Sequence, residues 1–201
     1  GVVTLTNNAN LEGLTLSGNG AAVTYNAAVA EKVTLTGDQS VTFAGTAAVV
    51  AATVLTDSTT AGTTTGSITT ADTGDFSKVG ADVLSFATAT GTETYTVANG
   101  QNVVITAAPT GATDVITLDI HDDDAGTTIT DGSIDLTLEK AFLTGNQIKL
   151  DNAGDKAVTL NVTSTVAQGA LNIDTQATTG TKIDVASSKA ITIDANSKAA
   201  E

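Results

Sequence analysis

Six acidic or imidazole side chains crowd one short stretch of this 201-residue chain, "DIHDDDAGTTITDG". Carboxylates at such density repel one another unless they are solvated or bound to a cation. Hard oxygen ligands of this kind suit Ca²⁺, which accepts six to eight oxygens in a flexible geometry. The spacing is not that of an EF-hand loop, and an exposed acidic turn without an ion is the alternative. The candidate calcium ligands are Asp119, Asp122, Asp123, Asp124 and Asp131.

His121, the only histidine of the chain, lies inside the same stretch. A histidine beside carboxylates can act as a general base or a metal ligand. With no cysteine and no second histidine, a zinc site or a His dyad has no further ligands, and no GxSxG elbow accompanies a Ser-His-Asp arrangement. A surface histidine in an acidic loop is therefore the simpler interpretation.

The sequence also lacks the residues that usually accompany a glycosidase site or a nucleotide-binding site. Carboxylates such as Asp72 and Asp75 could in principle serve glycoside hydrolysis, but the aromatic and basic residues that line sugar-cleaving grooves are scarce. No GxxxxGK[ST] phosphate-binding loop occurs. We expect a protein that is not an enzyme, with no catalytic and no cofactor-binding residue.

The strands that would position the acidic residues are predicted from a regular repeat, which is clearest near the C-terminus. An Ile-Asp pair returns every ten residues, at 173–174, 183–184 and 193–194. Neighbours in a β-strand point to opposite faces, so each Ile is expected to point inward and each Asp outward. The ten-residue interval then corresponds to one strand plus one turn. If a coil holds two such units, Ile173 stacks on Ile193, and Ile183 faces them across a narrow core.

Short runs that alternate apolar residues with Thr, Asn or Asp continue along most of the chain, as in "VVTLT", "KVTLT" and "ETYTV". Strands at this spacing fit a solenoid or an antiparallel sandwich. The dipeptides "NG" at 19–20 and 99–100 and "DG" at 131–132 favour hairpins, whereas the Ile-Asp repeat favours stacked coils. The sequence predicts an all-β fold, a parallel β-helix-like β-solenoid of roughly ten-residue strand–turn units, with an antiparallel β-sandwich as the alternative.

The repeat weakens in two places. Residues 57–81 are polar and are expected to form an irregular, loop-rich segment or weak coils within the array. Residues 139–149, "EKAFLTGNQIK", are compatible with a short helical turn or cap. Neither break divides the chain, so residues 1–201 are expected to form a single β-rich module.

Composition excludes several partners. The formal net charge is −14 with eight Lys and no Arg, so a nucleic-acid partner is not expected. No segment reaches the length of an apolar membrane span, and residues 1–30 lack a signal-peptide pattern. Because the chain opens on Gly1 within a strand-like run, we expect it to be a fragment of a longer protein, whose export signal lies outside it.

The composition and the repeats of the chain resemble those of the repetitive surface proteins that Gram-negative bacteria export by the type I route. These are the S-layer proteins of Caulobacter and Campylobacter type and their RTX relatives. The resemblance rests on the richness in Thr, Ala, Gly, Asn and Asp, the low pI, and units such as "AEKVTLTGDQSVTFAGTA". It implies a β-rich surface protein with calcium-dependent folding and lateral assembly. The RTX nonapeptide itself is missing, and only Gly80, Asp82 and Leu84 resemble part of it, so the RTX calcium rows cannot be transferred to this chain.

The sequence thus predicts a structural module of an S-layer protein, secreted to the bacterial cell surface, that self-assembles into a lattice with Ca²⁺. Its expected partners are further copies of itself, through lateral contacts, or neighbouring domains of the parent chain. A stalk or binding domain of a large secreted adhesin is the alternative function.

Overall fold

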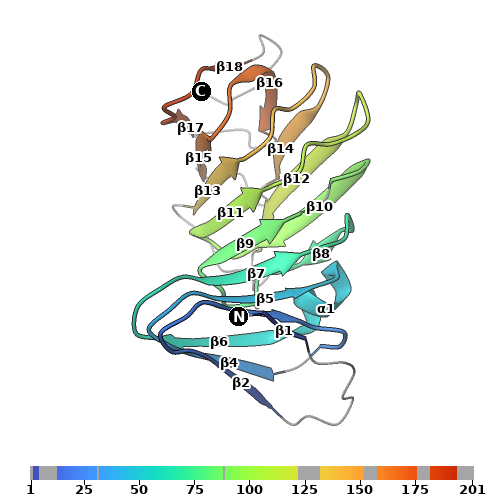
Figure 1. Ribbon diagram of the computed structural model, residues 1–201. Coiled ribbons are helices and arrows are strands. Elements are labelled where there is room, and N and C mark those ends of the chain that lie inside the picture. The colour runs from blue at the N-terminus through green and yellow to red at the C-terminus, as the bar shows by residue number, and fades with distance from the viewer. Residues whose placement is uncertain are drawn as a thin grey trace.

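The fold is a β-solenoid, in which the chain coils repeatedly and adjacent coils pair through parallel strands (Figure 1). The computed structural model describes residues 2–4, 13–30, 32–87, 89–121, 132–151, 158–175 and 182–193. Successive coils differ in length: Val83 lies beside Thr65, 18 residues earlier, whereas Ile134 lies beside Gln101, 33 residues earlier. Because adjacent coils pair through parallel strands, the predicted all-β solenoid is confirmed, and the antiparallel sandwich is not the fold.

One side of the solenoid is a nine-stranded sheet in the order β1-β3-β5-β7-β9-β11-β13-β15-β17. Every second strand of the chain belongs to it, as a coil with two strands requires. Its members are β1 (Val2–Thr4), β3 (Val23–Asn26), β5 (Val41–Gly45), β7 (Thr64–Ile68), β9 (Val83–Phe86), β11 (Gln101–Ile105), β13 (Gly132–Leu138), β15 (Val158–Ser164) and β17 (Lys182–Val185).

The alternate strands form two smaller sheets on the other side (Figure 1). A three-stranded sheet has the order β2-β4-β6, and a six-stranded sheet has the order β18-β16-β14-β12-β10-β8. The strands are β2 (Leu14–Gly18), β4 (Lys32–Gly37), β6 (Val54–Thr59), β8 (Gly74–Asp75), β10 (Thr92–Val97), β12 (Val115–Ile120), β14 (Gln147–Asp151), β16 (Gln168–Thr175) and β18 (Ile191–Ile193).

The core consists of inward side chains that stack strand upon strand. In the six-stranded sheet, Ile116 pairs with Ile148 and Ile148 pairs with Ile173, and all three are fully buried. All four Phe and both Tyr of the chain also lie in the core, including Phe76, Phe86 and Tyr95. Burial of such a continuous column is the main favourable contribution to the stability of the fold.

The turns differ from the hairpins that the "NG" dipeptides suggested. Gly20 and Gly100 do adopt positive φ angles of 69° and 78°, as turn glycines do. Each turn, however, leads from a strand of one sheet to the next strand in the opposite sheet, so it bends the coil instead of pairing its flanking strands. The third dipeptide includes Asp131, which lies outside the described residues.

The two expected breaks in the array take different forms. Within residues 57–81 the chain completes β6 and forms β7 and the two-residue β8, which continue the solenoid. Residues 144–145 form a turn, and β14 begins at Gln147, so the helical turn expected in 139–149 is absent there. Within the described residues, the α-helix is instead α1 (Ala47–Ala52), capped by Thr46.

The Ile-Asp repeat places its strands as expected but in a different register. Ile173 lies in β16 and is fully buried, while Ile183 lies in β17 of the opposite sheet and packs against the same core. Ile193 pairs with Leu171 and not with Ile173, so the predicted stacking of Ile173 on Ile193 is wrong. Leu171 and Ile193 are 22 positions apart, and not the 20 positions that two ten-residue units require.

Candidate functional site

Asp119 lies in a row of polar residues that crosses the outer face of the six-stranded sheet. Asp75 of β8 pairs with Thr96 of β10, Thr96 pairs with Asp119 of β12, and Asp119 pairs with Asp151 of β14. Adjacent strands lie about 4.8 Å apart, so Asp119 and Asp151 are neighbouring carboxylates. We call these four residues, Asp75, Thr96, Asp119 and Asp151, the acidic row.

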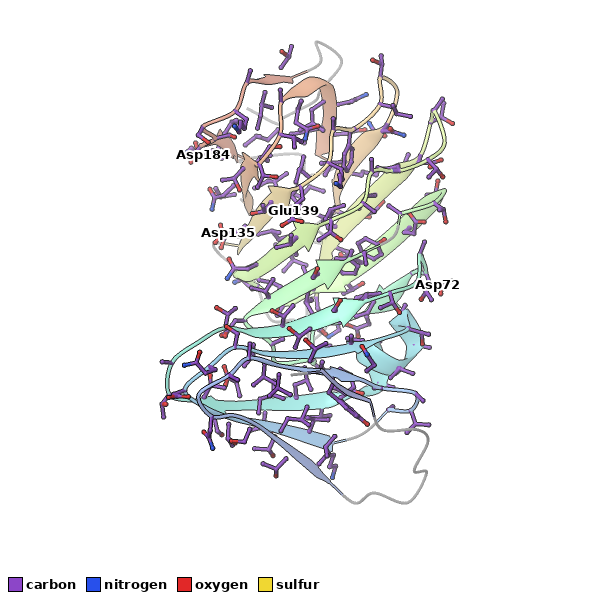
Figure 2. The ribbon with its side chains drawn as sticks, viewed as in Figure 1. Asp72, Asp135, Glu139 and Asp184 are labelled. Carbon is purple, nitrogen blue, oxygen red and sulfur yellow. The ribbon has the colours of Figure 1, made fainter. Side chains whose placement is uncertain are left out.

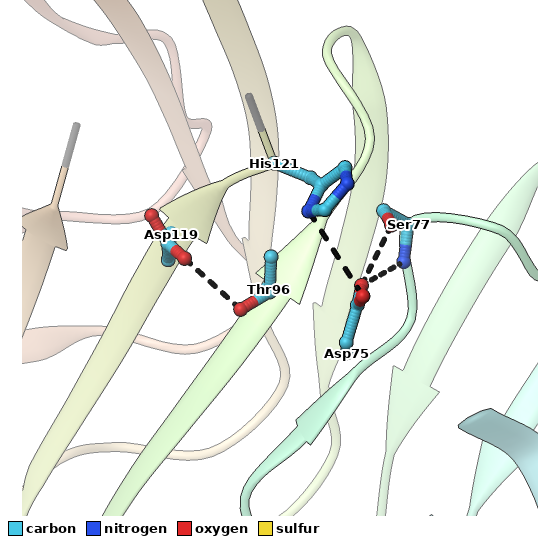
Figure 3. A network of polar contacts seen from close by, with 5 residues as sticks. All are labelled: Asp75, Ser77, Thr96, Asp119 and His121. Carbon is cyan, nitrogen blue, oxygen red and sulfur yellow. Dashed lines mark hydrogen bonds and ion pairs between the residues drawn. The ribbon is translucent and has the colours of Figure 1, made fainter. Parts of the chain in front are cut away.

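The surroundings of Asp119 disfavour its charge. Its side chain is half-buried, and its Oδ2 accepts a hydrogen bond of 3.0 Å from Thr96 Oγ1 (Figure 3). Burial raises the pKa of Asp119, the Thr96 hydrogen bond opposes that rise, and the neighbouring charge of Asp151 adds to it. A bound cation would reverse this effect by stabilising both carboxylates.

His121 follows β12 and faces the other end of the acidic row. Its Nδ1 lies 3.9 Å from Asp75 Oδ2, and Asp75 Oδ1 accepts hydrogen bonds from Ser77 N (3.0 Å) and Ser77 Oγ (2.6 Å) (Figure 3). Burial alone would raise the pKa of Asp75, but the Ser77 hydrogen bonds and the charges of His121 and Lys78 outweigh it, so this pKa is lowered. Asp75 is therefore a carboxylate that is already compensated, unlike Asp119.

The acidic row contains part of what calcium requires. Carboxylate oxygens suit Ca²⁺, and two adjacent carboxylates could share one ion, but a complete shell takes six to eight oxygens. No group of three or more His, Cys, Asp or Glu among the described residues is arranged to hold a metal. Of the predicted ligands, Asp119 belongs to the row, while Asp122, Asp123, Asp124 and Asp131 lie outside the described residues.

Asp151 is the neighbour that the sequence did not reveal. It lies 32 positions after Asp119, and only the register of β12 and β14 brings the two together. Spacing could not have identified the pair, because the length of that coil depends on the segment between the strands.

A second polar row crosses the nine-stranded sheet. Asn102, Asp135, Asn161 and Asp184 occupy successive register positions on β11, β13, β15 and β17. Asn161 Nδ2 donates a hydrogen bond of 2.6 Å to Asp135 Oδ1. Figure 2 shows Asp135 and Asp184 on one side of the molecule and Asp72 on the other. The amides separate the carboxylates, which therefore lie two strand spacings apart, at about 9.6 Å.

Asn161→Asp is expected to destabilise this amide–carboxylate row. The change removes the hydrogen bond to Asp135 and places three carboxylates at successive positions, at a cost of about 1 kcal/mol. Thermal unfolding in low salt should show a melting temperature roughly 2–4 °C below that of the wild type. Salt should recover part of the loss by screening. The control Asn161→Ala loses the hydrogen bond without adding charge, so an equal salt response in both variants would contradict the repulsion.

Comparisons with known proteins do not assign this chain to a family. No family model matches it, and neither a curated protein nor a solved structure matches it significantly. Among the described residues, no helix is long and apolar enough to cross a membrane.

Proposed function

We propose that this chain is a structural module of a bacterial extracellular surface layer, which assembles laterally and is stabilised by calcium. The parallel register of the strands supports this proposal, because it forms an extended scaffold with regular outer faces. Those faces carry side chains in straight rows, as in the acidic row and the Asn102–Asp184 row. Repeated rows on the outer faces of the sheets suit repeated contacts with identical neighbours.

The charge of the chain gives calcium a role in such an assembly. At a net charge of −14, two copies repel one another at neutral pH. Divalent cations at outward carboxylates reduce that repulsion, and Asp119 and Asp151 lie at neighbouring register positions where they can share an ion. Lateral association should therefore need millimolar Ca²⁺, the concentration range of extracellular calcium sites.

Electron microscopy and light scattering of the purified chain test this function. We expect ordered sheets or large assemblies in millimolar Ca²⁺ and dispersal in EDTA. The variant Asp119→Asn/Asp151→Asn should assemble less at the same Ca²⁺ concentration. Its matched control is Asp38→Asn/Asp57→Asn, which removes the same charge from the region around β4 and β6. If both double variants assemble alike, calcium does not act through the acidic row.

A stalk or binding domain of a large adhesin is the second candidate, because an elongated stack of coils also suits a spacer (Figure 1). Such a stalk should remain monomeric with and without Ca²⁺. Monomers in every condition, at concentrations where a surface layer would form, would therefore favour the adhesin.

A further inference from the structure

Glu93 occupies a core position of β10. The strand alternates outward and inward side chains, and Glu93 shares the inward face with Tyr95 and Val97. Across the sheet it pairs with Ile116, which begins the column of three fully buried isoleucines. Glu93 is only 2 % exposed, so a carboxyl group occupies the place where the next three strands have an aliphatic side chain.

One of the two carboxyl oxygens of Glu93 has a partner. Oε1 accepts a hydrogen bond of 2.8 Å from Thr90 N. Oε2 is buried and has no hydrogen-bond partner among the described residues, and the same holds for the hydroxyl of Tyr95. A buried acceptor without a donor is costly, and a buried ionised carboxylate is costlier still.

A similar hydrogen bond occurs at the start of the next two strands of the sheet, two register positions before the one that Glu93 occupies. Gly111 N donates to Asp114 Oδ2 (2.7 Å), and Leu143 N donates to Asn146 Oδ1 (2.8 Å), each across the same three-residue interval as Thr90 to Glu93. Asn146 is fully buried and neutral. Its Nδ2 also donates 2.6 Å to the Gly111 carbonyl of the preceding coil, which satisfies its second polar atom.

A proton on Glu93 Oε2 would make that oxygen equivalent to the amide nitrogen of Asn146. The neutral carboxyl would then accept from Thr90 with one oxygen and donate with the other. The charged groups that face Glu93 from the adjacent elements also favour the neutral form. Asp114 precedes β12 and Asp72 precedes β8, and both carry negative charge.

We propose that the protonation state of Glu93 controls the packing of the sheet around it. We call the ends of β8, β10 and β12 around Glu93 the corner. The corner is tightly packed while Glu93 is neutral and loosens when Glu93 ionises. Burial is the main cause of a raised pKa at Glu93, the Thr90 hydrogen bond opposes it, and the charges of Asp114 and Asp72 add to it. A folded-state pKa above the unfolded value means that the folded chain binds the proton more tightly. The corner is therefore most stable below the usual Glu pKa of about 4.3, and it loses stability as the pH rises through the folded-state pKa.

The first test compares Glu93→Gln with the matched control Glu139→Gln by thermal unfolding from pH 4 to pH 8. Glu139 is exposed, so the control makes the same chemical change without a buried group (Figure 2). Glutamine at position 93 imitates the protonated acid. Glu93→Gln should match the wild type near pH 4 and melt roughly 2–4 °C higher at pH 8, the shift expected for about one kcal/mol. The gain of Glu93→Gln between pH 4 and pH 8 should exceed that of Glu139→Gln, which measures the effect of removing one surface charge. A Glu93→Gln difference that is constant with pH would overturn the proposal.

The second test detects the Glu93 charge directly through Tyr95. The chain has no Trp and only two Tyr, so in a Tyr25→Phe background the tyrosine emission comes from Tyr95. The charge of Glu93 contributes to the raised pKa of the Tyr95 hydroxyl, after burial, so the two groups are electrostatically coupled. We expect the emission to titrate with a midpoint above 4.3 and the titration to vanish in Tyr25→Phe/Glu93→Gln.

A divalent cation could instead neutralise Glu93, and the same variants distinguish this case. If Ca²⁺ at pH 8 raised the melting temperature of the wild type and not that of Glu93→Gln, the corner would bind a cation and the proton mechanism would be wrong. An equal response of both proteins to Ca²⁺ supports the proton and leaves the proposed calcium site elsewhere unaffected.

Discussion

Ile148→Asp is expected to lower the free energy of unfolding by several kcal/mol, enough to leave much of the chain unfolded at room temperature. Ile148 is fully buried and lies between Ile116 and Ile173 in the stacked column. An aspartate there removes apolar contacts on both sides and buries a charge. The fold has no alternative face for it, because a shift of one residue would turn the buried side chains of β14 outward and its polar ones inward.

Lys149→Asp is the matched control, since it introduces the same residue one position later on the outer face. Lys149 is half-buried and pairs with Thr117 and Asp174, so the change replaces an oppositely charged neighbour of Asp174 with a like-charged one. We expect a loss of about 1 kcal/mol or less. Urea unfolding followed by circular dichroism measures both variants. Similar midpoints for the two would mean that the Ile148 column does not form the core.

The alternation of apolar and polar residues was sufficient to predict the fold class. Thr, Val and Ile at period two favour strands with one buried face, and the Ile-Asp repeat indicated coils of two units. Strand identity did not determine register, however. Leu171 and Ile173 fit the same inward pattern, and the length of the coil, 22 residues from Leu171 to Ile193, pairs Ile193 with Leu171.

The sites were less accessible to sequence reasoning, for two different reasons. Asp151 joins Asp119 through a coil whose length follows from no local rule, so the pairing needed the structure. The buried position of Glu93, in contrast, could have been predicted from the sequence. In "ETYTV" the glutamate has the same parity as Tyr95 and Val97, so the alternation that predicts the strand also places Glu93 inside. A carboxyl at a core position is an exception that identifies a site worth testing.

Calcium is expected to raise the melting temperature of the wild type, whereas Mg²⁺ should have a smaller effect, because Mg²⁺ demands stricter geometry and releases its waters reluctantly. For a site with a Kd of roughly 10⁻⁴–10⁻³ M, 10 mM Ca²⁺ stabilises the folded state by about 1.4–2.7 kcal/mol. The physical cause lies in the acidic row. Asp119 and Asp151 repel each other at neighbouring positions, and an ion shared between them removes the repulsion only when the strands are paired.

Two double variants separate the possible sources of the ligands. Asp119→Asn/Asp151→Asn removes the register pair, and Asp122→Asn/Asp124→Asn changes the acidic run that follows it in the sequence. Thermal unfolding at pH 7.5 in EDTA, Mg²⁺ and Ca²⁺ should show a calcium response in the wild type and a reduced one in each variant, if both parts contribute to one site. In EDTA, Asp119→Asn/Asp151→Asn should also melt slightly above the wild type, because the repulsion is gone. Identical wild-type curves in all three solutions would leave these residues as plain surface charge, with no part in the stability of the solenoid.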